Sequence, residues 1–314
     1  MPGEGLRAVA FKGLAEVGGL RMGVGEWFGT FCTNLKIDNS KRSSIAGRTS
    51  RITAQLNYDF RGLTSEIAHR FYVGSYGRGT AIPSVSDVDV LYQLPFELYG
   101  QYDAYATNGQ SALLSAVRTS VQHTYPTSSI SGNGQVVVVS FADGIRFEIL
   151  PAFLNNEDGF TFADSNSGGS WKSCKPKQEM DAFSQRNAVC SGNLVELSRM
   201  TRAWHDTNNV DISGMLIDTL AFQFIETWAH RDKGYLYYDW LTRDFFGYVA
   251  SQDVKQQYWR APGSGSYVAR TGGFEFKARQ AELRAIEAIA YQANSNDWSA
   301  KQKYREIYGT GFPS

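Results

Sequence analysis

The chain has 314 residues, more than one typical domain, and 42% of them are hydrophobic, so a sizeable core can form. Its 31 basic and 31 acidic side chains balance, which argues against a strongly basic surface that coats nucleic acid. Its three scattered cysteines form no CxxC pair, which argues against a structural zinc site or a disulfide framework and favours a reducing cytoplasm.

The first half of the chain alternates between helical and strand patterns. From 37 to about 70, apolar residues recur at three- to four-residue spacing, which predicts one long helix or two helices joined near Gly62. Short apolar strands are expected at 71–73 and at 87–94, and the next helix is expected over 104–122. Residues 1–30 are rich in glycine and predict no clear start of the fold.

The clearest local signal is a hairpin, in which QVVVVSF and IRFEILPAF flank the turn ADG. Residues 155–192 are polar and rich in Gly and Ser, and we expect a long structured loop there. The rest of the chain is predicted to be helical, with a turn-rich break over 260–273 and helices over 193–207, 212–231 and 275–293.

This order of elements predicts an α+β fold with two lobes. A mixed β-sheet flanked by helices would occupy residues 1–190, and a helical domain would occupy 191–314. The polar segment near 155–190 is the expected boundary. A cleft between the lobes is then the natural place for a binding site.

Two aspartates stand one residue apart in the second predicted strand. Side chains alternate along a strand, so Asp87 and Asp89 point to the same face. Like charges among apolar neighbours repel, and a cation between them would relieve that repulsion. Oxygen-only ligands suit a hard ion such as Mg²⁺ or Mn²⁺. Glu148, in the second arm of the hairpin, is the candidate for a third acidic ligand.

A Gly-Ser pair precedes these acids. Glycine at 74 lets the backbone approach a ligand closely, and the Ser75 hydroxyl with successive amides can cradle a triphosphate. Two other interpretations stay open at this point. The aspartates can belong to a solvated edge strand, and Glu148 can pair with Arg146 or a lysine.

Phosphoryl chemistry explains the combination best. Two metal ions held by three carboxylates would stabilise the attacking hydroxyl and the leaving pyrophosphate. The sequence has no GxxxxGK[ST] loop and no protein-kinase signature set, so nucleotidyl transfer onto a hydroxyl is favoured over ATP hydrolysis.

These motifs resemble those of the polymerase-β-like nucleotidyltransferases. Within that superfamily, GSYGRGTAIPSVSDVDVLYQLP and FEILPAF are most similar to the bacterial cyclic-oligonucleotide synthases (CD-NTases), relatives of animal cyclic GMP-AMP synthase. Three further stretches support the narrower resemblance: GGSWKSCKPKQEMDAFSQRN, LVELSRMTRAWHDTNNVDISGMLIDTLAFQF and YREIYGTGFP. The likeness spans roughly residues 45–312.

The resemblance implies a bilobed nucleotidyltransferase with roles for particular residues. Asp87, Asp89 and Glu148 would be catalytic and would hold two Mg²⁺ or Mn²⁺ ions. A glutamate stands where the superfamily often has aspartate, with the same oxygen ligands.

Further residues would contact the nucleotide. Gly74 and Ser75 would bind it, together with Arg202, which replaces the family's phosphate-binding lysine and keeps its charge. Ser213 would bind phosphate or cap a helix, and Arg78 would bind phosphate or lie on the surface.

The implied function is synthesis of a cyclic di- or trinucleotide second messenger from ATP, GTP or pyrimidine NTPs, with release of pyrophosphate. By resemblance, the product would switch on a separately encoded effector in bacterial anti-phage (CBASS) signalling, and the enzyme would have a regulatory protein partner. No membrane segment and no stable nucleic-acid partner are expected. The alternatives are a template-independent RNA-tailing enzyme, which would need an RNA-binding module, and a catalytically inactive nucleotide sensor.

Overall fold

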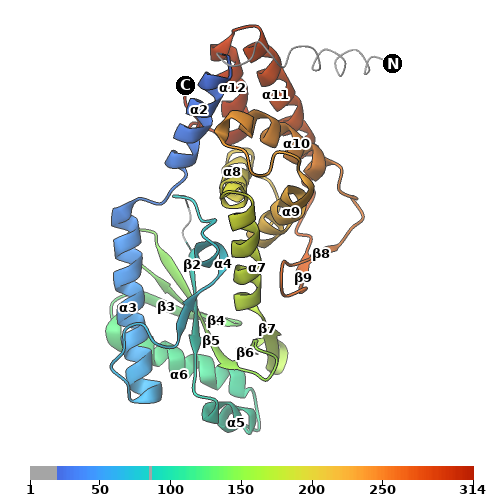
Figure 1. The fold of residues 1–314 in the computed structure, drawn as a ribbon. Coiled ribbons are helices and arrows are strands. Elements are labelled where there is room, and N and C mark those ends of the chain that lie inside the picture. Colours follow the sequence, from blue (N-terminus) through green and yellow to red (C-terminus); the bar gives the residue numbers. More distant parts are fainter. Residues whose placement is uncertain (1–19, 85–86) are drawn as a thin grey trace.

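The computed structural model describes residues 20–84 and 87–314; the glycine-rich start over 1–19 and Ser86 lie outside the described residues. The predicted α+β fold with two lobes is confirmed. A sheet with its helices forms one end of the molecule, and helices form the other end (Figure 1).

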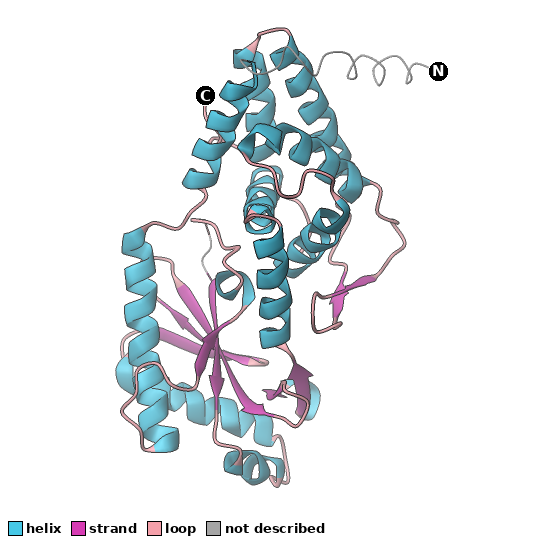
Figure 2. Cartoon of the chain, in the orientation of Figure 1, coloured by secondary structure: helices cyan, strands magenta, loops and turns pink. Residues whose placement is uncertain are grey.

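The described residues form a seven-stranded mixed sheet, whose central part runs β1-β2-β5-β4-β3 (Figure 2). Its strands are β1 Arg70–Tyr72, β2 Asp87–Gln93, β3 Ser129–Asn133, β4 Val136–Ser140, β5 Arg146–Leu154, β6 Phe160–Asp164 and β7 Ser170–Cys174. β2 and β5 are parallel and the other pairs are antiparallel. The predicted hairpin is confirmed as β4 and β5, and the strands predicted at 71–73 and 87–94 as β1 and β2.

Two long helices, α3 (Asn39–Arg61) and α6 (Gly109–Thr124), cover one face of this sheet. Their apolar residues share one core cluster with the inward-facing residues of β2, β4 and β5. In β2, buried Val88 and Val90 alternate with half-buried Asp87 and Asp89. The alternation therefore turns the acids to the face opposite α3 and α6.

Two predicted helix bounds were wrong. The helical pattern was expected to reach residue 70, but the helix ends at Arg61, at the break expected near Gly62, and no second helix follows among the described residues before β1. Gly62 takes the left-handed conformation (φ 64°), and its N–H bonds to the carbonyls of Asn57 and Tyr58. The helix expected from 104 begins at Gly109, where the Asn108 side chain accepts a hydrogen bond from the Ser111 amide at 2.9 Å. The short helices α4 (Gly74–Gly77) and α5 (Glu97–Asp103) complete the lobe.

The expectation of a long loop over 155–192 was also wrong. The segment contains β6, β7 and the helix α7 (Pro176–Val189), with proline in its first turn. The turn-forming residues are concentrated between β6 and β7, where Gly168 and Gly169 have positive φ. α7 leads from the sheet toward the helical lobe (Figure 1).

The helical lobe is built from α8 to α12 with a small hairpin. Its helices are α8 Asn193–Asn208, α9 Gly214–Thr227, α10 Tyr238–Ala250, α11 Glu275–Ala293 and α12 Asp297–Tyr308, and its strands are β8 Tyr258–Arg260 and β9 Tyr267–Ala269. The predicted helices over 193–207, 212–231 and 275–293 correspond to α8, α9 and α11. α10 and α12 lie where the chain was expected to be helical, but their bounds were not predicted, and neither was the hairpin.

The helix α2 (Leu20–Asn34) packs in this same lobe. Phe28 lies with its ring centroid 5.0 Å from that of Tyr304 and 5.1 Å from that of Phe312. A division of the chain at residue 190 would thus separate α2 from the core into which it packs. The division itself stays a prediction.

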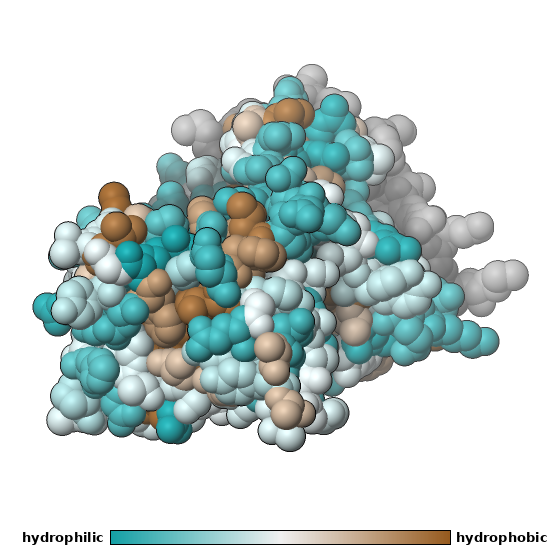
Figure 3. All heavy atoms as spheres, turned by 90° about the horizontal axis from the view of Figure 1, so that it is seen from below, coloured by the Kyte–Doolittle hydropathy of each residue, from teal (hydrophilic) through white to brown (hydrophobic). Residues whose placement is uncertain are grey.

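The surface at the sheet end is mostly polar, and its hydrophobic residues gather in limited areas (Figure 3). In the described part of the chain, no helix has the length and apolar character needed to cross a bilayer.

Candidate active site

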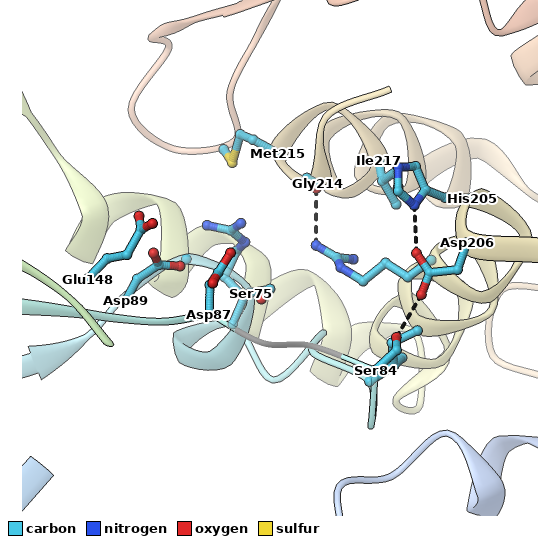
Figure 4. A pocket seen from close by; sticks show the side chains of 14 residues that line it. Ser75, Ser84, Asp87, Asp89, Glu148, His205, Asp206, Gly214, Met215 and Ile217 are labelled. Carbon is cyan, nitrogen blue, oxygen red and sulfur yellow. Dashed lines mark hydrogen bonds and ion pairs between the residues drawn. The ribbon is translucent and has the colours of Figure 1, made fainter. Parts of the chain in front are cut away.

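A cavity of about 540 Å³ lies between the two lobes. The sheet lobe lines it with Gly74, Ser75, Arg78, Ile82, Ser84, Asp87, Asp89 and Glu148, and the helical lobe with Arg202, His205, Asp206, Gly214, Met215 and Ile217. The structure thus brings together every residue that the sequence predicted for the site except Ser213. Figure 4 shows the three acids together at one end and Ser84, His205 and Asp206 at the other.

The acids meet because β2 and β5 are parallel neighbours. The register pairs Asp89 with Glu148, and Asp87 and Asp89 share one face of β2. Burial, with a further contribution from repulsion by Glu148 and Asp87, raises the pKa of Asp89 to about 6. The three neighbouring carboxylates repel one another, and a cation bound between them would relieve this repulsion.

The structure explains why position 74 is a glycine. Its φ is 60°, and a β-carbon at this position would overlap the carboxylate of Asp89. The Val73 amide also donates to the Asp89 backbone carbonyl at 3.0 Å. Any larger residue at 74 would therefore displace an acidic side chain of the site, and Ser75 follows directly in the wall of the cavity.

A guanidinium bridges two of the acids. The Nε atom of Arg146 donates to Asp87 Oδ1 at 2.8 Å, and its Nη2 atom donates to Glu148 Oε1 at 2.9 Å. The pairing of Glu148 with Arg146, left open from the sequence, is thus present. Its signal was the spacing: Arg146 stands two residues before Glu148, so strand alternation puts both on one face.

A divalent ion fits the donor chemistry of this cluster, which is all carboxylate oxygen. Among residues 20–84 and 87–314, however, no three Asp, Glu, His or Cys side chains are arranged to share one metal ion. In the described arrangement the Arg146 guanidinium pairs with Asp87 and Glu148 and offsets one of their two negative charges.

The two arginines predicted to bind phosphate are held by a residue that the sequence analysis missed. Asp218 of α9 is fully buried, and Arg202 pairs with both of its carboxylate oxygens, at 2.6 and 2.9 Å. Arg78 reaches the same carboxylate from the other lobe, with Nε to Oδ2 at 2.8 Å. Burial opposes ionisation of Asp218, but Arg202 and Arg78 outweigh it and hold its pKa below the usual value.

These contacts distinguish the two arginines. Arg202 also donates to the backbone carbonyls of Ser198 and Gly214, so both of its Nη atoms have protein partners. No partner for the two Nη atoms of Arg78 lies in the part of the chain that the structure describes. Of the two arginines, Arg78 is therefore the one whose Nη atoms still have hydrogen-bond donors that a phosphate could use. A lone charge in the apolar run GMLIDTLAFQF was the signal for Asp218.

Ser213 caps α9, and its hydroxyl accepts a hydrogen bond from the Leu216 amide at 3.2 Å. The described residues that line the cavity include Gly214 but not Ser213. A phosphate contact by Ser213 stays a prediction.

The far end of the cavity carries a polar cluster that the sequence analysis did not assign. Asp206 accepts a hydrogen bond from the Ser84 hydroxyl at 2.6 Å and lies 2.8 Å from His205 Nδ1 (Figure 4). The bond to His205 is the main reason that the pKa of Asp206 lies below its usual value. The cavity is therefore lined by polar groups at this end as well as at the end that holds the three acids.

Comparison with known proteins supplies the family. Residues 22–187 match the Second Messenger Oligonucleotide or Dinucleotide Synthetase (SMODS) domain, which is more than half of the chain. The chain belongs to the SMODS family. A curated relative, a probable cyclic nucleotide synthase of Bacillus cereus, is 20% identical over 178 residues. That match covers 54% of this chain and 52% of the relative, so the SMODS chain spans about half the length of that relative.

Solved structures share the whole bilobed fold of the SMODS chain. CdnC of E. coli superposes with a TM-score of 0.65 at 15% identity, covering 92% of this chain and 98% of CdnC. The CD-NTase CdnG of Bradyrhizobium diazoefficiens, in complex with GTP, gives 0.64 at 9% identity, covering 90% and 94%. DncV of Vibrio cholerae gives 0.59 at 11% identity, covering 94% and 88%. The expected CD-NTase fold is confirmed.

Proposed function

We propose that this chain is a metal-dependent nucleotidyltransferase that joins NTPs into a cyclic di- or trinucleotide and releases pyrophosphate. The observation that carries the proposal is the register of β2 and β5, which puts Asp87, Asp89 and Glu148 together in a cavity between two lobes. Membership in the SMODS family and the CD-NTase fold support it.

Asp87, Asp89 and Glu148 would hold two Mg²⁺ or Mn²⁺ ions. When bound, such ions stabilise charge on the attacking and leaving oxygens of the transfer. Glu148 also offers a carboxylate oxygen to accept the proton of the attacking 3′- or 2′-hydroxyl. The acid end of the cavity is thus where we expect the bond between nucleotides to form.

The donor triphosphate would lie along Ser75 and Arg78. Ser75 lines the cavity together with the acids, and Arg78 is fixed at Nε by Asp218 with its Nη atoms still available. A guanidinium held in this way loses little freedom when it binds phosphate. Arg202 would contribute its charge to the phosphate region while anchored to Asp218.

The wider role that we propose follows the relatives. CdnC has been solved with ATP and in a complex with HORMA-deltaN, and CdnG with GTP. For this chain we propose purine NTPs as substrates, activation by a protein partner, and a product that switches on a separately encoded effector in anti-phage (CBASS) signalling in the cytoplasm.

A product assay tests the proposal. The purified chain is incubated with all four NTPs and Mg²⁺ or Mn²⁺, and we expect pyrophosphate and a small product that resists phosphatase because it has no terminal phosphate. Asp87→Ala with Asp89→Ala should abolish both while leaving the fold intact, as measured by circular dichroism. A ladder on added RNA would instead indicate a tailing enzyme, and an unfolded double variant would make the acids structural.

A further inference from the structure

Arg146 shares a sheet face with the three acids. The parallel register of β2 and β5 pairs Asp87 with Arg146 and Asp89 with Glu148, so the four side chains form two adjacent rows. All four are half-buried positions in strands whose alternate residues are core. The cluster is therefore three negative charges and one positive charge, and not an acidic group alone.

The contacts put that positive charge between the strands. Nε bonds to Asp87 and Nη2 bonds to Glu148, at 2.8 and 2.9 Å, so a single guanidinium spans one acid from each strand. A divalent ion bound by Asp87 and Glu148 would lie beside this guanidinium, and the two cations would repel each other. Arg146 and such an ion therefore compete for these two acids.

The Arg146 side chain is much less enclosed than the arginine of the buried pair. The Arg146 side chain is 43% exposed, compared with 9% for Arg202 in its buried pair with Asp218. The described residues that line the cavity include Asp87 and Glu148 but not Arg146. Its long side chain can turn toward solvent without breaking the core.

We propose that Arg146 is a built-in competitor of the divalent metal: it pairs with Asp87 and Glu148 before the metal arrives and is displaced when the metal binds. The proposal rests on the proposed function, since it concerns the same acids. It assigns Arg146 the role of setting metal affinity. A residue that merely braces two strands would leave metal affinity unchanged.

The test is direct binding of Mn²⁺ to the nucleotide-free chain, followed by calorimetry or by the electron paramagnetic resonance signal of free Mn²⁺. Two exposed ion pairs of ordinary strength correspond to a change of roughly 2- to 30-fold in Kd, so Arg146→Gln should bind Mn²⁺ more tightly by that factor. Arg146→Lys keeps the charge and loses the two-point contact, and we expect an intermediate affinity.

Arg48→Gln is the matched control. Arg48 pairs with Asp143 through two hydrogen bonds, at 3.0 and 2.8 Å, on the same lobe but away from the acids. Its loss should leave Mn²⁺ affinity unchanged. Equal or weaker Mn²⁺ binding by Arg146→Gln, or no Mn²⁺ binding by either the wild type or this variant, would overturn the proposal.

The results distinguish a failure of the Arg146 proposal from a failure of the proposed function. If the wild type makes a phosphatase-resistant product but Arg146→Gln leaves Mn²⁺ affinity unchanged, the function stands and the competition is refuted. If Arg146→Gln tightens Mn²⁺ binding and NTPs are added to RNA as a ladder in place of a phosphatase-resistant product, the competition stands and the function is refuted.

Discussion

Asp218 offers the sharpest test of how the two lobes are joined. It is fully buried and forms ion pairs with Arg202 of its own lobe and with Arg78 of the other lobe. The Thr80 hydroxyl also donates a hydrogen bond to its Oδ2 atom at 3.1 Å. Asp218→Asn keeps the shape of the side chain but removes its charge. It also replaces one acceptor oxygen by an NH₂ group, which faces donors.

The expected cost follows from burial. The two arginine side chains are only 7% and 9% exposed, so each would be left with an uncompensated or poorly matched charge. Removing one partner of a buried ion pair typically costs about 3–5 kcal/mol in free energy of unfolding. We expect Asp218→Asn to lie in that range, because water replaces little of the lost interaction.

Urea unfolding followed by tryptophan fluorescence measures the loss, and Asp143→Asn is the control. Asp143 is 45% exposed in its pair with Arg48, so its substitution should cost only about 0–1 kcal/mol. Equal losses for the two variants would refute the reasoning, because they would show that the Asp218 cluster is no stronger than a surface pair.

Two further predictions concern Gly74 and acid pH. Gly74→Ala should cost about 1–3 kcal/mol in backbone strain and should also abolish pyrophosphate release by displacing Asp89. Gly79→Ala is the control: its strain is similar (φ 72°), but nothing lies within 4 Å of the added carbon. It should lower the free energy of unfolding while leaving turnover intact. The pKa of Asp218 in the folded state lies below its unfolded value of about 3.9. The ionised carboxylate therefore stabilises the fold above about pH 3.9, and this stabilisation is lost as the pH falls through the folded pKa. The free energy of unfolding of the wild type should therefore drop below about pH 4, and Asp218→Asn should drop less; parallel curves would contradict this assignment.

The sequence predicted which side chains of each strand share a face because that information is local. Alternation in DVDVLY and in RFEILPAF indicates which side chains share a face, and the hairpin turn fixes where β5 begins. The same rule, applied two residues upstream of Glu148, would have placed Arg146 beside it.

The remaining features depend on contacts between distant parts of the chain. Asp218 pairs with Arg78, which lies 140 positions away in the sequence, and with Arg202, which lies 16 positions away. The aromatic residues of α2 find partners near the opposite end of the chain, such as Phe28 with Phe312. Over 155–192, the glycine and serine of one tight turn obscured the two short strands beside it.

The central claim is that Asp87, Asp89 and Glu148 form a metal-dependent site for nucleotidyl transfer. The most direct test is pyrophosphate release from NTPs, titrated with Mn²⁺ or Mg²⁺, by the wild type and by Asp89→Asn, which keeps the side chain's size and removes its charge. The account predicts release by the wild type only when metal is present, and background release by the variant at every metal concentration. Metal-independent release, or full release by Asp89→Asn, would contradict it.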